Sequence, residues 1–126
     1  DIHFLKKKIE HGADYIVTQM FFDNQKYFDF VKLCRENDIN VPIVPGLKPL
    51  STAKQLNVLP HRFHLNLPEL LVKEVLKCKG KEDIRQVGVE WAVQQTKELI
   101  SFGALCIHFY TMGRTDNVIK IMSNFS

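Results

Sequence analysis

Long apolar runs alternate along the chain with segments whose apolar residues recur at helical spacing. The runs are rich in β-branched and aromatic residues and lie at 15–22, 41–45 and 105–110. Such runs are typical of short strands that are buried on both faces of a parallel sheet. The amphipathic segments between them are long enough for crossover helices, so the pattern predicts parallel βαβ units.

The predicted helices have recognisable ends. Asp23 or Asn24 can cap a helix that runs to about Asn37, Ser51 is a good N-cap, and Pro68 suits a first helical turn. We expect helices over 2–11, 24–37, 52–58, 68–78, 82–102 and 116–122. The expected inner faces are Tyr27, Phe30, Val31 and Cys34 in the second helix, Leu71, Val75 and Leu76 in the fourth, and Ile84, Val87, Trp91, Ala92, Leu99 and Ile100 in the fifth.

The length of 126 residues predicts one domain over 1–126. Three strands are too few to bury both faces of a sheet, so the chain looks incomplete as a free-standing fold. An open three-layer sheet and a portion of an eight-stranded barrel would both produce this order of elements. The sequence therefore predicts an α/β fold and leaves these two architectures open.

Composition narrows the class of protein. A hydrophobic fraction of 45% and a charged fraction of 25% are ordinary for soluble domains. No apolar window is long enough to span a membrane, and no signal sequence opens the chain, so we expect a cytoplasmic protein. A net charge of +3 is small for a nucleic-acid groove. The three cysteines form no C-x-x-C pair, and we expect them to be buried free thiols.

Candidate chemistry lies where each apolar run ends, because ligands of parallel α/β proteins gather at the carboxyl ends of strands. Gln19 is a carboxamide among apolar neighbours, and it could donate and accept hydrogen bonds at the edge of a heterocycle. A glutamine satisfied by neighbouring backbone is the simpler reading. Arg114 could hold a carboxylate in a bidentate fork, although most loop arginines are only solvated.

Other charged positions have simpler explanations. Lys7 and Lys8 could reach cofactor phosphates, but a helix dipole also accounts for lysines at a helix end. His61 and His64 would share a helical face, yet no third ligand stands at a familiar spacing, so we expect no metal site. The residues alone thus indicate a parallel α/β chain with polar strand ends.

Three motifs give the sequence a family resemblance. They are Thr18-Gln19-Met20-Phe21-Phe22-Asp23, Pro45-Gly46-Leu47-Lys48-Pro49 and His108-Phe109-Tyr110-Thr111-Met112-Gly113-Arg114. Their order and spacing resemble those of methylenetetrahydrofolate reductases over essentially the whole chain. The resemblance implies a (β/α)8 TIM barrel of which this chain is the C-terminal portion, with strands 6 to 8 and their flanking helices.

The resemblance also implies an activity. Bound FAD would take a hydride from NADH or NADPH and pass it to 5,10-methylenetetrahydrofolate, giving 5-methyltetrahydrofolate for one-carbon metabolism and methionine synthesis. Both the folate substrate and the pyridine nucleotide would use the same flavin face. We expect no nucleic-acid or membrane partner, and a homo-oligomer for the full-length protein.

Matching positions carry the family's site residues onto this sequence. The resemblance implies folate contacts from Gln19, Gln55, Leu59 and Arg114, with Gln19 also meeting the nicotinamide. It implies FAD contacts from Asp1, Lys7 and Lys8. Phe4 and Gly113 depart from asparagines that other members carry at these positions.

The family's general acid would lie upstream of Asp1, so the resemblance implies no catalytic residue within this chain. We therefore expect the chain alone to be inactive and to bind flavin poorly. The alternative is a catalytically silent α/β module that binds a phosphate-bearing ligand or a partner subunit.

Replacing Arg114 by alanine in the complete enzyme should weaken folate binding by about 1.5–3 kcal/mol, the range for a hydrogen bond to a charged group. Titration calorimetry with the folate measures this loss. An unchanged affinity would make Arg114 a solvated surface residue.

Overall fold

Helices and strands alternate along the chain much as the apolar pattern predicts. The structure is a computed structural model that describes residues 2–110. Its elements are α1 (Ile2–Glu10), β1 (Ile16–Met20), α2 (Asn24–Glu36), β2 (Ile43–Leu47), α3 (Gln55–Phe63), α4 (Glu69–Leu76), α5 (Lys81–Phe102) and β3 (His108–Phe109). The predicted helix at 116–122 lies outside the described residues.

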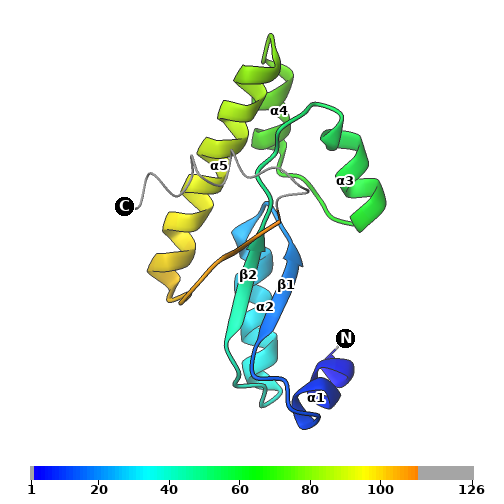
Figure 1. The fold of residues 1–126 in the computed structure, drawn as a ribbon, viewed down its shortest axis with the longest axis vertical. Coiled ribbons are helices and arrows are strands. Elements are labelled where there is room, and N and C mark those ends of the chain that lie inside the picture. Colours follow the sequence, from blue (N-terminus) through cyan, green and yellow to red (C-terminus); the bar gives the residue numbers. More distant parts are fainter. Residues whose placement is uncertain (1, 111–126) are drawn as a thin grey trace.

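The strands form one parallel sheet in the order β1-β2-β3. This confirms the predicted α/β class with parallel strands. Figure 1 shows β1 and β2 side by side. The strand bounds differ from the prediction: β2 continues through Pro45 and Gly46, because it is the central strand and has a partner on each side. The third apolar run pairs only at His108 and Phe109, where β3 meets the end of β2.

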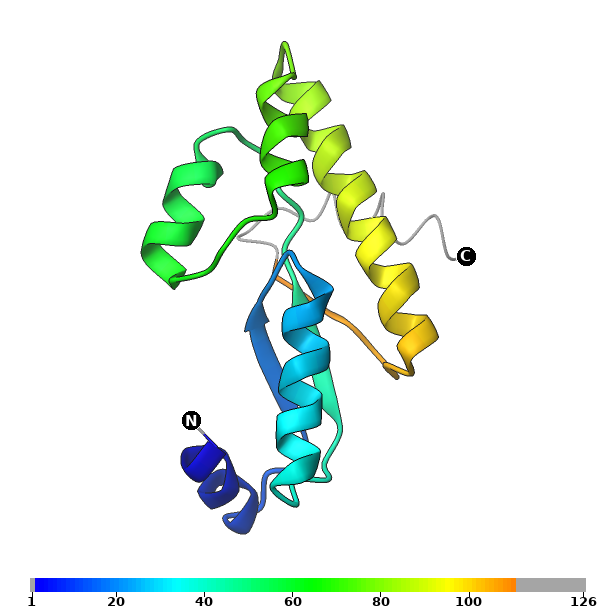
Figure 2. The same ribbon diagram turned by 180° about the vertical axis from the view of Figure 1, so that it is seen from behind.

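The first hydrophobic cluster lies between the sheet and the helices that cover it. Figure 2 shows α2 over β1 and β2, with α5 beside it. The cluster consists of Phe21, Tyr27, Cys34, Ile39, Ile43, Leu47 and Leu99. The partly buried side chains of Ile2, Leu5 and Ile9 pack α1 against it. Burial of this face is what holds the helical layer to the strands.

The second cluster lies beyond the carboxyl ends of the strands, where α3, α4 and the first turns of α5 meet (Figure 1). It consists of Met20, Phe22, Leu50, Leu59, Leu71 and Val75. The two clusters meet at the loop after β1, since Phe21 belongs to the first and Phe22 to the second. That loop is therefore anchored on both sides.

Several helix ends differ from the prediction. Asp23 caps α2 as expected, with its carboxylate 3.0 Å from the backbone N–H of Gln25. Ser51 is not the N-cap of α3, which begins at Gln55 directly after Lys54, and the Ser51 hydroxyl donates to the Gln55 side chain at 3.4 Å instead of accepting a helix N–H. α3 also runs on through Pro60.

Some predicted core positions were wrong. Leu76 and Ile100 are 70% and 51% exposed, because α4 and α5 are covered along narrower stripes than the apolar pattern suggests. All three cysteines are free as expected, but only Cys34 is buried, and Cys106 is exposed. Cys106 lies in the segment that approaches β3 without strand pairing, so its side chain has no sheet face to pack on.

Gly88 allows α5 to touch the backbone that follows β2. A Cβ atom on Gly88 would lie 1.7 Å from the carbonyl oxygen of Leu50 and 2.7 Å from its carbonyl carbon. No side-chain rearrangement can relieve a clash with backbone. Gly88 therefore fixes how closely the helical layer approaches the carboxyl end of the sheet.

Gly88→Ala should lower the free energy of unfolding by about 3 kcal/mol, the upper end of the cost of overpacking. Helix propensity alone would favour alanine by about 1 kcal/mol. A decrease in the free energy of unfolding therefore indicates the clash, and an increase indicates propensity. Chemical denaturation measures the change. Gln94→Ala, at an exposed position of α5, is the control and should be nearly neutral; equal behaviour of both variants would contradict the close approach.

Candidate functional site

A groove of about 490 Å³ runs along the outer edge of β1. Phe4 of α1, Lys26 of α2 and His64 after α3 line it together with Gln19 of β1. No described strand pairs with this edge of β1. The groove thus combines apolar walls with a few polar side chains, as ligand sites commonly do.

Gln19 is exposed in this groove, and its carboxamide makes no hydrogen bond to any other residue within 2–110. The simpler reading from sequence, a glutamine satisfied by neighbouring backbone, is therefore wrong. A strand irregularity between Val17 and Met20 turns this part of β1 away from regular pairing. Both the donor and the acceptor of the carboxamide remain available to a ligand.

Side chains of α5 hold the loop that follows Gln19. Trp91 donates its indole N–H to the carbonyl of Phe22 at 2.8 Å, and Gln95 donates to the carbonyl of Phe21 at 3.3 Å. Asn24 and Gln95 are both buried and bond to each other, with 3.0 Å between Gln95 Nε2 and Asn24 Oδ1. Asn24 also donates to the carboxylate of Glu98 at 3.0 Å. These bonds fix the start of the loop relative to the helical layer.

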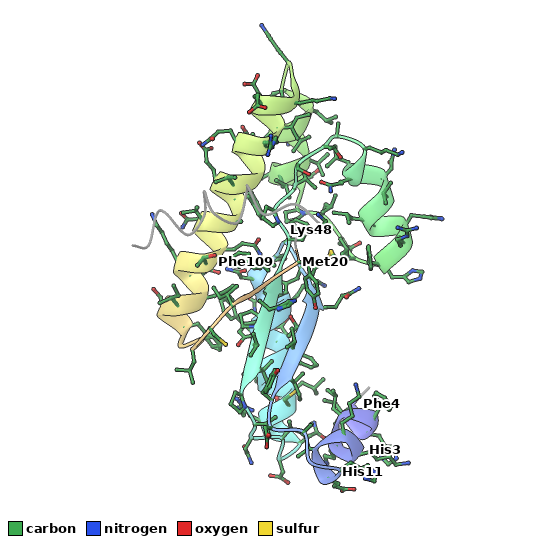
Figure 3. All side chains as sticks on the ribbon, viewed as in Figure 1. His3, Phe4, His11, Met20, Lys48 and Phe109 are labelled. Carbon is green, nitrogen blue, oxygen red and sulfur yellow. The ribbon has the colours of Figure 1, made fainter. Side chains whose placement is uncertain are left out.

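Lys48 follows the central strand and is only 5% exposed. Figure 3 shows it at the carboxyl end of the sheet, near Met20 and Phe109. Its ammonium has no hydrogen-bond or ion-pair partner in the described part of the chain, and burial lowers its pKa. Burying an ammonium without a partner lowers the stability of the fold. Such a residue is unusual away from a functional site.

The predicted folate contacts Gln55 and Leu59 lie on α3. The Gln55 oxygen accepts hydrogen bonds from the N–H groups of Ser51 and Thr52, at 2.8 and 3.2 Å. Its amide N–H groups bond to no described residue, so they remain available as donors. Leu59 is 2% exposed and belongs to the second cluster, and its folate contact stays a prediction.

The predicted cofactor contacts are described only in part. Lys7 and Lys8 are exposed at the last turn of α1, and the Lys8 ammonium lies 4.9 Å from the centroid of the Phe4 ring. Asp1 and Arg114 lie outside the described residues. The predicted meeting of Gln19 and Arg114 in one cavity thus stays a prediction.

His61 and His64 line different grooves. His64 faces the groove beside β1, while His61 lines a second groove on the flank of α3. Over residues 2–110 no cluster of three or more His, Cys, Asp or Glu side chains could hold a metal ion.

Sequence reasoning did not single out Lys48 within its strand-end motif, and it missed the hydrogen-bonding set formed by Asn24, Trp91 and Gln95. A lysine directly after an apolar strand was a usable signal for the first. The partners of Asn24 lie more than seventy positions away along the chain, so no local pattern could have revealed them.

Comparisons with known proteins identify the family of this chain. The sequence profile of the family described as methylenetetrahydrofolate reductase matches residues 1–126. Methylenetetrahydrofolate reductase (NADH) 1 of Arabidopsis thaliana is 33% identical over 125 residues, covering 98% of this chain and 21% of the relative. The 5,10-methylenetetrahydrofolate reductase of Buchnera aphidicola subsp. Baizongia pistaciae is 33% identical over 130 residues, covering 100% of this chain and 44% of the relative.

A solved structure shares the fold. An uncharacterized protein from Clostridium thermocellum, described as binding two copies of 5-methyl-5,6,7,8-tetrahydrofolic acid, superposes with a TM-score of 0.66 at 21% identity. The match covers 97% of this chain and 45% of that protein. At this identity the likeness shows the fold alone.

The fold is that of a parallel α/β protein, with a groove beside β1 that reaches the carboxyl end of this strand. Within that class the chain belongs to the methylenetetrahydrofolate reductase family. It spans less than half the length of the relatives named here. None of the described helices is long and apolar enough to cross a membrane.

Lys48→Met should raise the free energy of unfolding at pH 7 by about 1–3 kcal/mol, the cost of leaving a buried polar group unpaired. The gain should shrink above the lowered folded-state pKa, because wild-type stability rises with pH until the unfolded lysine also loses its proton. Denaturation at several pH values measures both effects.

Lys97→Met, at an exposed position of α5, is the control for the loss of a charge and should be nearly neutral. A loss of stability in Lys48→Met would mean that the ammonium has a partner outside residues 2–110.

Proposed function

We propose that this chain forms the folate-binding part of a flavin-dependent enzyme. The enzyme reduces 5,10-methylenetetrahydrofolate to 5-methyltetrahydrofolate with NADH or NADPH as electron donor. The exposed carboxamide of Gln19, at the carboxyl end of β1 in a chain of this family, is the observation that carries the proposal. Relatives named for NADH and for NADPH both match, so the donor is left as either nucleotide.

The three parallel strands would be the sixth, seventh and eighth of a (β/α)8 barrel. Their order, with sequential strands adjacent and helices on one face, is the arrangement that a barrel requires. The outer edge of β1 would then pair with the fifth strand. Active sites of such barrels lie at the carboxyl ends of the strands, where Gln19 and Lys48 are found.

A neutral carboxamide suits the chemistry at Gln19. The pterin and the nicotinamide both present amide-like edges with a donor beside an acceptor, and one carboxamide can match each in turn. A carboxylate at this position could only accept hydrogen bonds and would carry a charge into the groove. The residue would therefore orient the ligand without exchanging a proton with it.

The cofactor FAD would supply the hydride-transfer chemistry when bound. Lys7 and Lys8 fit its phosphate groups by chemistry, since both ammonium groups are exposed at the end of α1. Phe4, beside them, lines the same groove as Gln19. On the folate side, the amide N–H groups of Gln55 can donate to the substrate, and Arg114 would hold the carboxylates of its glutamate.

Gln19→Glu should slow folate reduction at least tenfold, a change of about 1.4 kcal/mol, because an acceptor-only carboxylate cannot match the ligand edge. The ratio of folate to pyridine-nucleotide turnover should also change, while FAD stays bound. Steady-state kinetics on the full-length protein, with flavin content recorded by absorbance, measures these outcomes.

Gln94→Glu is the matched control, because it makes the same change at an exposed position of α5 and should leave the kinetics unaltered. Unaltered kinetics in Gln19→Glu would remove this residue from the site. A wild-type protein that binds flavin but reduces no folate would contradict the proposed function itself.

A further inference from the structure

β1 contains a bulge at Thr18 and Gln19. Val17 pairs with Val44 and Met20 pairs with Gly46, so two residues of β1, Thr18 and Gln19, oppose the single residue Pro45 of β2. Bulges commonly re-aim a side chain beside an active site.

Side chains satisfy the backbone groups that the bulge displaces. The N–H of Gly46 donates to the hydroxyl of Thr18 at 2.9 Å. The hydroxyl of Tyr110 donates to the carbonyl of Thr18 at 2.8 Å. The peptide group between Thr18 and Gln19 is thus held by a side chain that comes from the far side of the central strand.

Gly46 makes this crossing possible. A Cβ atom at Gly46 would lie 2.6 Å from Cε2 of Tyr110 and 2.7 Å from the carbonyl oxygen of Thr18. The Tyr110 ring therefore passes directly over Gly46 to reach β1. The backbone of Tyr110 is fixed as well, since its N–H donates to the carbonyl of Leu47 at 2.8 Å. The ring of His108 packs edge-on against it at 4.6 Å between centroids.

We propose that Tyr110 and Thr18 are positioning residues, which lock the bulge of β1 so that the Gln19 carboxamide is presented to the folate in one orientation. The proposal rests on the proposed function, because it takes Gln19 as the ligand contact. Neither hydroxyl needs to touch the ligand. Both act through Thr18: its carbonyl accepts a hydrogen bond from Tyr110, which follows β3, and its hydroxyl accepts one from Gly46 of β2. Preorganisation of this kind removes the cost of ordering the contact residue when the ligand binds.

The test uses the full-length protein with its cofactor bound. Tyr110→Phe removes one hydroxyl and keeps the ring over Gly46, and Thr18→Val removes the acceptor of the Gly46 N–H. We expect each variant to bind 5-methyltetrahydrofolate about tenfold more weakly by titration calorimetry, with kcat/KM for folate falling by a similar factor. Thr18→Ser retains the hydroxyl and should recover most of the affinity.

Tyr27→Phe is the matched control. The Tyr27 hydroxyl also donates to a backbone carbonyl of β2, that of Ile43 at 2.6 Å, but at the opposite end of the strand. Its loss should lower Tm and leave folate affinity unchanged. If Tyr110→Phe likewise changes only Tm, its hydroxyl is structural and the positioning role is wrong.

The wild-type protein separates this inference from the proposed function. A wild type that binds and reduces folate, with unchanged affinity in Tyr110→Phe and Thr18→Val, overturns the positioning role alone. A wild type that neither binds nor reduces folate overturns both. Should Thr18→Val fail to fold, the gentler Tyr110→Phe still decides the question.

Discussion

The central position of β2 is the constraint on which the rest of the structure depends. Within a few residues this strand lies opposite the bulge of β1 at Pro45, admits the Tyr110 ring at Gly46 and contributes Leu47 to the first cluster. The segment that follows carries Lys48 and then touches α5 at Leu50. A change in this stretch would therefore be felt in the sheet, the helical layer and the groove together.

The helix α5 contacts both hydrophobic clusters. Its last turns place Leu99 in the first cluster, and its early turns pack against Leu50 through Gly88. Between these ends, Trp91 and Gln95 bond to the loop after β1. One long helix thus sets the distance between the core and the end of the sheet where ligands would bind.

The sequence predicted the class of fold because buried parallel strands and amphipathic helices have distinct periodicities. It placed α2 and α5 to within a residue or two, since Asp23 and Gly103 are strong local signals. It failed where tertiary contacts decide the outcome. The helix expected from Thr52 begins only at Gln55, and pairing on both sides carried β2 through Pro45.

In the candidate site, sequence could identify a residue that is unusual in its own segment, but not one whose role depends on distant segments. Gln19 could be singled out because a carboxamide at the end of an apolar strand is unusual on its own. Tyr110 could not be, because its role depends on a glycine in β2 and on a target in β1 that are both distant from it along the chain. Such a role belongs to three strands at once, so no single segment of sequence contains it.

The hydrogen bond between Tyr110 and Thr18 joins residues 92 positions apart, whereas β1 and β2 are joined by a single short helix. Contacts between neighbouring segments close smaller loops and tend to form early in folding, and distant ones come later. The β1-α2-β2 unit can therefore assemble before β3 arrives. The Thr18 carbonyl would gain its hydrogen bond from Tyr110 only when β3 joins the sheet, so the orientation of Gln19 would depend on the part of the sheet that forms last.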